Sequence, residues 1–312
     1  MNILVLYGGQ SAEREVSLMS GREVASALRE SGHEVRLLDF GRDTLPTLFL
    51  DAPDVVFIAL HGRLGEDGTV QGLMELLGYP YVGSGVMASA LAIDKRMTKR
   101  ILSKEGVPVP RELFATRSAS QDHAQLAQTA GEQLGWPLII KPNREGSTIG
   151  LTLAHDAQEA QDGIGKAFLH DSEILIEQYL HGMEVTVAVV GEGDASQVLG
   201  VIEIIPRAEL YDYESKYTAG GSQHIIPARL APQVREQVEA FALLAYRTVG
   251  CRDFARVDLI VKDDQPFVLE VNTLPGMTYT SLVPDAARAS GISFAAFLDG
   301  LAHSARRRGE LG

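Results

Sequence analysis

The sequence has few of the residues and segments that define several broad classes of protein. It contains one cysteine among 312 residues, Cys251, so a disulfide framework is excluded and a reducing cytosol is expected. We interpret that thiol as a small buried hydrophobe ahead of a nucleophile. No apolar run approaches the roughly 20 residues that span a bilayer, and the run at residues 3–7 is too short for a signal peptide. These absences predict a cytoplasmic globular protein with no membrane partner.

Positive charge is also scarce. The chain has 28 lysines and arginines against 41 aspartates and glutamates, a formal net charge of −13. We therefore expect no nucleic-acid partner, because neutralising a phosphate backbone requires clustered basic side chains. ATP is compatible with this acidic total, since a local basic site and bound Mg²⁺ offset the charge of the phosphates. The glycine loop after the first apolar run lacks the G-x-G-x-x-G pattern, which argues against a Rossmann dehydrogenase.

The pattern of apolar segments predicts an N-terminal unit over residues 1–95. Three apolar runs of strand length alternate with helical patterns, at residues 3–7, 35–39 and 55–60. Runs that are apolar on both faces are typical of a parallel sheet covered by helices, which predicts a doubly wound unit. A helical pattern over residues 88–105 leads out of it, and the Val-Pro-Val-Pro segment at 107–110 forbids its continuation.

Two further units are predicted, at residues 96–180 and 181–312. The first has strand patterns separated by helical ones, with a glycine-containing loop at residues 143–150. The second has strand patterns joined by short connections, typical of antiparallel pairing. Residues 207–223 are polar and aromatic, and we interpret them as a long loop of the kind that is usually functional or disordered.

The last predicted hairpin carries an unusual set of polar residues. Glu270 and Asn272 alternate with apolar residues and so share one face, and we place Asp258 at the far end of the partner strand, across from them. Arg256 faces the same side. Mg²⁺ prefers a few carboxylates together with phosphate oxygens, so a metal site is one interpretation. A surface salt bridge at a polar strand end explains these residues about equally well when the hairpin is taken alone.

Four other segments carry weaker signals. Lys141 ends an apolar strand before the loop at 143–150, which suits phosphate binding, although such turns are common. Glu177 and Glu184 suit an adenosine, although edge-strand acids explain them better. Glu13 follows the first strand, where it would hold an ammonium group or complement a helix dipole. His61 lies on a glycine-rich loop that reaches the same crevice.

Taken together, these segments resemble the D-alanine–D-alanine ligases of the ATP-grasp superfamily, over residues 3–298. The resemblance rests on six motifs, in the family's order: Gly-Gly-Gln-Ser-Ala-Glu-Arg-Glu-Val-Ser at 8–17, His-Gly-Arg-Leu-Gly-Glu-Asp-Gly at 61–68, Gly-Ser-Gly-Val-Met-Ala-Ser-Ala at 83–90, Lys-Pro-Asn-Arg-Glu-Gly-Ser-Thr at 141–148, Tyr-Asp-Tyr-Glu-Ser-Lys-Tyr at 211–217 and Glu-Val-Asn-Thr-Leu-Pro-Gly-Met-Thr at 270–278. It implies an α/β fold in which a doubly wound parallel sheet is followed by two ATP-grasp subdomains with mainly antiparallel sheets.

The resemblance also implies a set of site residues. Its ATP contacts would be Lys95, Lys141, Ser147, Glu177, Leu180, Glu184 and Lys216. Two Mg²⁺ ions, or Mn²⁺, would be held by Asp258, Glu270 and Asn272. The D-alanine substrates would contact Glu13, His61, Ser281 and Leu282. The catalytic set would be Glu13, Ser147, Arg256, Tyr217 and Gly276.

The implied reaction is the ATP-dependent joining of two D-alanines through an acyl phosphate, for peptidoglycan precursor synthesis. Tyr217 favours the dipeptide over a D-alanine–D-lactate product, because resistance-type ligases lack or replace this tyrosine. The family suggests a homodimer formed through the N-terminal unit. Two alternatives stay open: an ATP-grasp ligase for another amino acid, and a nucleotide-binding regulatory module without turnover.

Overall fold

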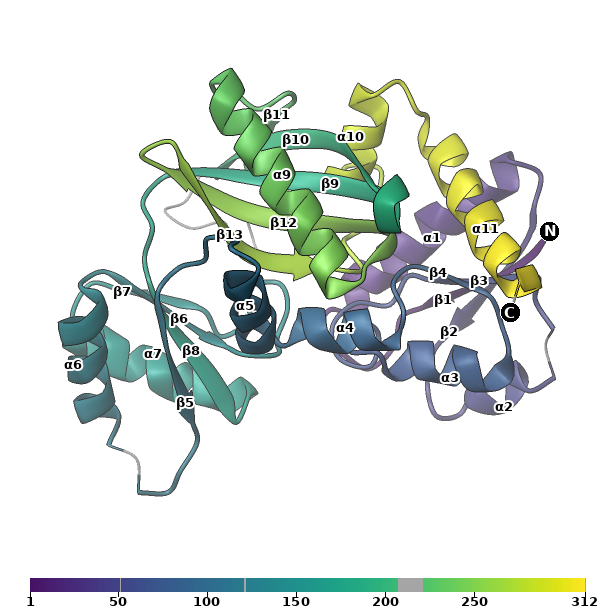
Figure 1. Ribbon diagram of the computed structural model, residues 1–312. Helices are drawn as coiled ribbons and strands as arrows, with labels where there is room; N and C mark the ends of the chain where they lie inside the picture. Colours follow the sequence, from purple (N-terminus) through teal and green to yellow (C-terminus); the bar gives the residue numbers. More distant parts are fainter. Residues whose placement is uncertain (51, 121, 207–220, 312) are drawn as a thin grey trace.

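The computed structural model describes residues 1–50, 52–120, 122–206 and 221–311, and this part of the chain contains three β-sheets (Figure 1). The first is parallel, and the other two are built from antiparallel pairs. This arrangement confirms the predicted α/β fold class, in which a parallel sheet precedes two antiparallel ones. The predicted unit boundaries, at residues 95 and 180, stay predictions.

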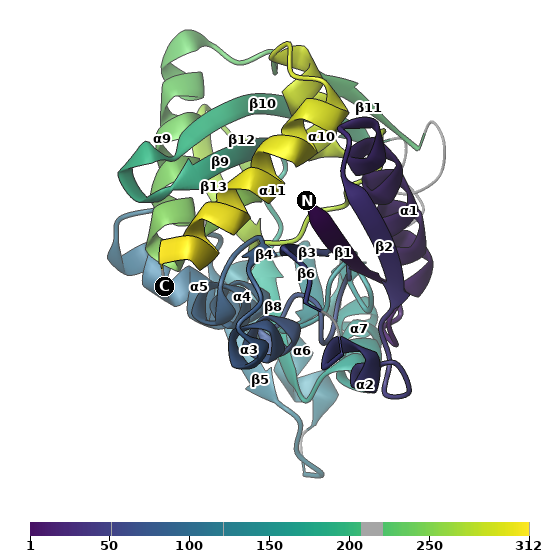
Figure 2. The same ribbon diagram turned by 90° about the vertical axis from the view of Figure 1, so that its right-hand side faces the viewer.

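The first sheet has the strand order β2-β1-β3-β4, with bounds Glu34–Asp39, Asn2–Tyr7, Val55–Ile58 and Tyr81–Val82. Its buried strand residues are apolar on both faces, because helices cover both sides. The helices of this part of the chain are α1 (Arg14–Glu30), α2 (Leu45–Leu48) and α3 (Thr69–Leu77). The last helix, α11 (Phe294–Leu311), lies beside α1 (Figure 2) and shares a hydrophobic core with the first sheet.

The second sheet has the order β5-β8-β6-β7, with bounds Glu112–Thr116, Glu173–Gln178, Leu138–Pro142 and Thr152–Ala154. Helices α6 (His123–Leu134) and α7 (Ala157–His170) pack against each other and bury a small core that includes Ile140 and Ile164. Asp122 and Asp156 cap the two helices, each accepting hydrogen bonds from backbone N–H groups of the first turn.

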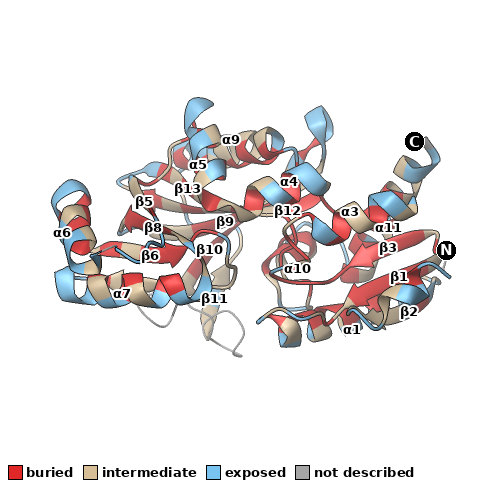
Figure 3. Ribbon diagram, turned by 90° about the horizontal axis from the view of Figure 1, so that it is seen from below, coloured by how far each residue is buried: buried red, intermediate tan, exposed pale blue. Residues whose placement is uncertain are grey.

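The third sheet has the order β11-β10-β9-β12-β13, with bounds Ser222–Ile225, Gln197–Pro206, Met183–Glu192, Arg252–Lys262 and Gln265–Asn272. A 3-10 turn, η1 (Gly193–Ala195), connects β9 to β10. Helix α9 (Pro232–Val249) crosses one face of this sheet (Figure 1) and buries Tyr246 fully. Helix α10 (Leu282–Ala289) contacts β10 and β9. Figure 3 shows that the buried residues concentrate in the sheets and on the helix faces turned toward them.

The helix predicted over residues 88–105 is wrong as one element, because two helices, α4 (Val86–Ile93) and α5 (Lys95–Lys104), meet at Asp94. Asp94 takes an extended conformation with ψ of 91°, and its carboxylate caps α5 by accepting the Met97 N–H at 3.0 Å. Lys95 therefore opens a new helix, and its N–H donates to the carbonyl oxygen of Asn143 at 3.3 Å. The break ties the start of α5 to the loop at residues 143–150.

Among the described helices, none has the length and apolar character needed to cross a membrane. The long loop predicted at residues 207–223 lies mostly outside the described residues, which resume at Gly221.

Candidate active site

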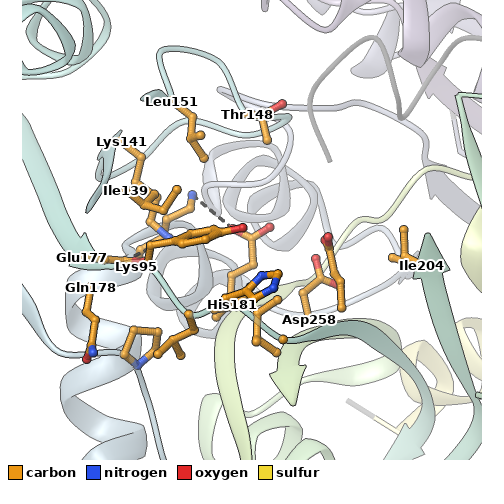
Figure 4. Close-up of a pocket in the computed structure, with 18 of the residues that line it drawn as sticks. Lys95, Ile139, Lys141, Thr148, Leu151, Glu177, Gln178, His181, Ile204 and Asp258 are labelled. Carbon is orange, nitrogen blue, oxygen red and sulfur yellow. Dashed lines mark ion pairs between the residues drawn. The ribbon is translucent and has the colours of Figure 1, made fainter. Parts of the chain in front are cut away.

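Two adjoining cavities bring together most of the predicted site residues. The larger, of about 530 Å³, lies between the second and third sheets (Figure 4). The smaller, of about 50 Å³, reaches from the hairpin β12–β13 to the loops that follow β1 and β3. Lys95, Gly146, Ser147 and Glu270 line both cavities. The two spaces therefore meet at a lysine, a carboxylate and the loop at residues 143–150.

A buried ion-pair cluster forms one wall of the larger cavity. Glu177 accepts from the ammonium groups of both Lys141, at 3.0 Å, and Lys99, and all three side chains are nearly buried. Glu112 adds a second carboxylate, 3.5 Å from Lys99. Figure 4 shows Lys141 and Glu177 on the opposite side of the cavity from Asp258. The cluster therefore sets two cations against two carboxylates, and Lys141 is the lysine of the pair that lines the cavity.

The pKa values of this cluster follow from burial and from the opposite charges. Burial alone would lower the pKa of Lys141, but the carboxylates of Glu177 and Glu270 outweigh it and raise that pKa. Burial lowers the pKa of Lys99, against the opposing effect of Glu177. For Glu177, burial would raise the pKa, and the two lysines reverse the direction and lower it. Lys141 and Glu177 are thus held in their charged forms.

Leu180 and Glu184 also line the larger cavity, as the family resemblance implies. The Glu177 carboxylate, which the family resemblance implies as an ATP contact, is bonded to the two lysines in this structure. The residues that follow it, 178–184, line the same cavity and offer backbone donors and acceptors to a flat ring.

The hairpin places its polar residues differently from the prediction. Asp258 lies directly opposite Glu270, not at the far end of the strand, and Arg256 lies opposite Asn272. A β-bulge between Asp258 and Leu259 shifts the register, so that Leu259 lies opposite Val268. The prediction that these side chains share one face is confirmed by this register.

The salt bridge weighed as an alternative for this hairpin does form. Arg256 donates to both carboxylate oxygens of Asp258, each at 2.8 Å, and Thr186 donates to the same carboxylate at 2.6 Å. The side chains of Arg256 and Asp258 are only 11% and 14% exposed, so this is not a surface pair. A carboxylate has about four acceptor positions, so these three bonds leave room for a cation at Asp258.

The hairpin's donor set fits Mg²⁺. It offers two carboxylates from facing positions and the amide oxygen of Asn272, which accepts the Leu274 N–H at 3.0 Å and keeps a second lone pair. Lys95 lies 3.7 Å from Glu270 and donates to the Glu145 carbonyl at 2.6 Å, so the carboxylate faces a cation across the junction of the two cavities.

Glu13 lies in the smaller cavity and is buried. It precedes α1, but its side chain makes no capping bond there; its carboxylate accepts a hydrogen bond from the Ser147 hydroxyl. Two glycines leave room for the Glu13 carboxylate. A Cβ on Gly62 would lie 2.7 Å from Glu13 Oε2, and a Cβ on Gly146 would lie 2.8 Å from it. Ser147 itself has a positive φ of 47°, an uncommon conformation for a residue with a side chain. The loop at residues 143–150 is therefore closed onto Glu13.

His61 is buried beside Glu13 and is held on both sides. Its Nε2 lies 3.1 Å from the Ser20 hydroxyl and its Nδ1 lies 3.5 Å from Glu66. The Ser20 hydroxyl also accepts the Met277 N–H, at 3.3 Å, which links α1 to the segment that follows β13. This network holds Gly276 at the cavity, where it is one of the lining residues.

The structure does not bring every predicted residue to the cavities. Ser281 and Leu282 line neither of the two: Ser281 bonds to Thr278, and Leu282 packs into the core of the first sheet. Ser281 remains a neighbour of the site, since its Oγ would lie 3.0 Å from a Cβ on Gly276. Lys216 and Tyr217 lie outside the described residues.

Sequence reasoning missed several residues that support the site. Lys99 stands one helical turn after Lys95, a spacing that puts both on one face of α5 and could have suggested a second buried cation. Thr186 and Ser20 act through partners distant in sequence, and no local pattern marks them. Glu66 lies in the same glycine-rich segment, 61–68, as its partner His61.

Known ligases resemble this chain over most of its length. A model of the D-ala D-ala ligase C-terminus matches residues 101–303, and one of the D-ala D-ala ligase N-terminus matches residues 42–84. A D-alanine–D-alanine ligase of Halalkalibacterium halodurans is 50% identical over 296 residues, covering 94% of this chain and 95% of the relative. The chain belongs to the D-alanine–D-alanine ligase family.

Solved structures of this ligase family share the fold over the whole chain. The D-alanine–D-alanine ligase of Bacillus anthracis complexed with ATP has a TM-score of 0.84 at 34% identity, covering 100% of this chain and 99% of that one. The VanG D-Ala:D-Ser ligase of Enterococcus faecalis has a TM-score of 0.80 at 32% identity, covering 97% and 99%. Ligases with different second substrates thus have the fold of this chain.

Proposed function

We propose that this protein uses ATP and Mg²⁺ to join two D-alanines into D-alanyl-D-alanine through an acyl phosphate. The observation that carries the proposal is the junction of the two cavities at Lys95 and Glu270. A nucleotide-sized space with paired lysines opens there onto a small polar space that contains a buried carboxylate, Glu13. Such a junction suits phosphoryl transfer to a small carboxylate substrate.

In the larger cavity, Lys141 and Lys95 would bind the phosphates, and residues 178–184 would contact the adenosine. The transferred phosphoryl group carries its charge on oxygens, so fixed ammonium groups stabilise it without reorganisation. Asp258, Glu270 and Asn272 would hold Mg²⁺, which supplies further neutralisation of the phosphate charge when bound.

In the smaller cavity, the buried carboxylate of Glu13 would bind the ammonium of the first D-alanine, with His61 beside it. One oxygen of that D-alanine's carboxylate attacks the γ-phosphorus, and ADP leaves. The free amine of the second D-alanine then attacks the carbonyl carbon, and the bond to the phosphorylated oxygen breaks to release phosphate.

Two groups would stabilise the oxyanion formed in the second step. The guanidinium of Arg256, fixed by two bonds to Asp258, and the backbone N–H of Gly276 both line or border the smaller cavity. The Ser147 loop, closed onto Glu13, would keep water from hydrolysing the acyl phosphate. The family resemblance assigns Tyr217 to the same closure and gives Ser281 and Leu282 the second D-alanine.

A coupled ADP-release assay tests the proposal, with ATP as the first component and D-alanine, L-alanine, D-serine or D-lactate added separately as the second. Of these four compounds, only D-alanine should stimulate ADP release and give the dipeptide. Release only with another amino acid would favour a different ATP-grasp ligase, and ATP binding without stimulated release would favour a regulatory module.

We also propose, from the family resemblance, a role in peptidoglycan precursor synthesis, a cytoplasmic location, and a homodimer formed through residues 1–95. Light scattering coupled to size-exclusion chromatography tests the last of these. A mass near the 33.7 kDa of one chain at micromolar concentration would contradict the homodimer.

A further inference from the structure

Two histidines and one aspartate meet outside both cavities, where the first and last parts of the chain pack together. His33 lies in the turn between α1 and β2, while Asp299 and His303 lie on α11, four residues apart and therefore on one face. Helices α1 and α11 lie side by side here (Figure 2). None of these three residues has a role in the proposed reaction.

The three side chains point their donor atoms at one space. His33 Nε2 lies 2.7 Å and His303 Nε2 lies 3.5 Å from the same oxygen of Asp299. One nitrogen or oxygen from each residue lies within 4.8 Å of the others. Ligands at the 2.0–2.2 Å that Zn²⁺ prefers are separated by about 3.3 Å in a tetrahedron, so small rotations would place all three around one ion.

One side of the cluster is buried and the other faces solvent, which suits a site with three protein ligands and one water molecule. The His33 side chain is 6% exposed, and its other ring nitrogen, Nδ1, lies 3.4 Å from the Met1 amino nitrogen, so the ring is held at both edges. His303 is 51% exposed and Asp299 is 36% exposed. The solvent side is therefore open for a water molecule as fourth ligand.

We propose that His33, Asp299 and His303 form a binding site for a borderline divalent transition metal such as Zn²⁺ or Co²⁺. Imidazole nitrogens favour these ions over Mg²⁺, which prefers oxygen ligands, so this site and the hairpin site select different metals. A bound ion would join the α1–β2 turn to α11. Because it binds the folded state, it would stabilise this packing without entering the reaction.

The competing explanation is a metal-free chain of hydrogen bonds in which Asp299 accepts from both histidines. Optical titration with Co²⁺ at pH 8, in excess Mg²⁺ to occupy oxygen-only sites, separates the two. Metals bind imidazole through a deprotonated ring nitrogen, so a mildly alkaline pH favours binding at a histidine site. We expect visible absorption bands of four-coordinate Co²⁺ that saturate at one equivalent and disappear when Zn²⁺ is added.

Variants locate the binding. His303→Ala and Asp299→Asn should each weaken Zn²⁺ binding more than about tenfold, since even outer-shell partners of metal ligands contribute on that order. The rise in melting temperature that Zn²⁺ causes should disappear with them, while ADP release with D-alanine stays unchanged. His155→Ala is the matched control, because His155 and Glu159 form a histidine–carboxylate pair of the same spacing elsewhere.

Absence of the Co²⁺ bands in the unmodified protein would overturn the proposal. So would equal Zn²⁺ affinity in the parent protein and in His303→Ala, whose exposed side chain is not needed for the core. Neither result depends on the proposed ligase reaction, because the readout is metal binding.

Discussion

The two cavities of the site are built in different ways. The larger holds its charges as buried pairs, with Lys99 and Lys141 both bonded to Glu177. The smaller gathers residues from loops after β1 and β3, the loop at 143–150 and the segment after β13. The nucleotide end thus has fixed electrostatics, whereas the amino-acid end depends on how distant segments dock. Changes at the two ends should therefore alter different kinetic parameters.

Glu270→Gln should have the largest effect, because Glu270 belongs to both cavities. Losing this carboxylate removes a proposed Mg²⁺ ligand and the partner of Lys95. We expect kcat to fall at least about a hundredfold, with an unchanged circular dichroism spectrum. Glu236→Gln, an exposed change on α9, is the control. Near-normal turnover in Glu270→Gln would contradict the metal assignment.

Glu13→Gln should affect only the amino-acid end. Replacing a buried carboxylate that binds an ammonium group removes a charge-assisted bond, so we expect the KM for D-alanine to rise about thirtyfold and the KM for ATP to change less than twofold. Steady-state kinetics with each substrate varied in turn measures this. The control is Glu15→Gln, an exposed change two residues away. Equal changes in both KM values would remove the distinction between the cavities.

Lys99→Met should affect the opposite end, by a smaller factor. Without Lys99, Lys141 is the remaining lysine of the cluster beside the carboxylates of Glu177 and Glu112, so it offers less positive charge to the phosphates. We expect the KM for ATP to rise about tenfold and the KM for D-alanine to stay the same.

The exposed Lys104→Met on the same helix controls for loss of a lysine. Because a neutral residue at a buried position also perturbs packing, Lys99→Met/Glu177→Gln is the second variant. It removes both charges of the pair and should recover part of the ATP affinity. No recovery would indicate a packing role for Lys99.

More of the fold than of the candidate site can be predicted from the sequence. Apolar runs and turn residues predicted the sheets because those signals are local, and the register of β12 and β13 confirmed that their polar residues share a face. The prediction of one continuous helix over 88–105 is wrong, although the residues around Asp94 are all compatible with a helix. Only the cap and the bond from Lys95 to Asn143 determine the break.

Long-range pairs explain the rest of what was missed. Lys99 and Glu177 are 78 residues apart, so no periodicity links them, and the shared carboxylate appears only once β8 lies under α5. The position of Asp258 opposite Glu270 depends on a β-bulge, and no residue pattern in the hairpin predicts that bulge. Ion pairs and bulges of this kind follow from tertiary packing.

The smallest effect is expected for Glu203, a buried residue that lines the larger cavity and pairs with Arg229. The hydrogen bond from Arg229 lowers the pKa of Glu203, so the pair stabilises the fold above about pH 4.5 and this contribution is lost as the pH falls through the lowered pKa. Since Arg229 is 61% exposed and solvent screens the pair, Glu203→Gln should lower the free energy of unfolding at pH 7 only slightly.

Urea unfolding at several pH values measures this change. The difference between Glu203→Gln and the parent protein should shrink below pH 4.5, and both KM values should stay near those of the parent. A difference that grows on acidification would have the wrong sign for a lowered pKa.

The most direct test of the central claim follows an oxygen atom. D-alanine labelled with ¹⁸O in its carboxylate is incubated with ATP, Mg²⁺ and the protein, and the released phosphate is analysed by mass spectrometry. If a D-alanine carboxylate attacks the γ-phosphate in this site, one labelled oxygen per turnover appears in the phosphate. Phosphate without label, released while the dipeptide forms, would contradict an acyl-phosphate route across the junction of the two cavities.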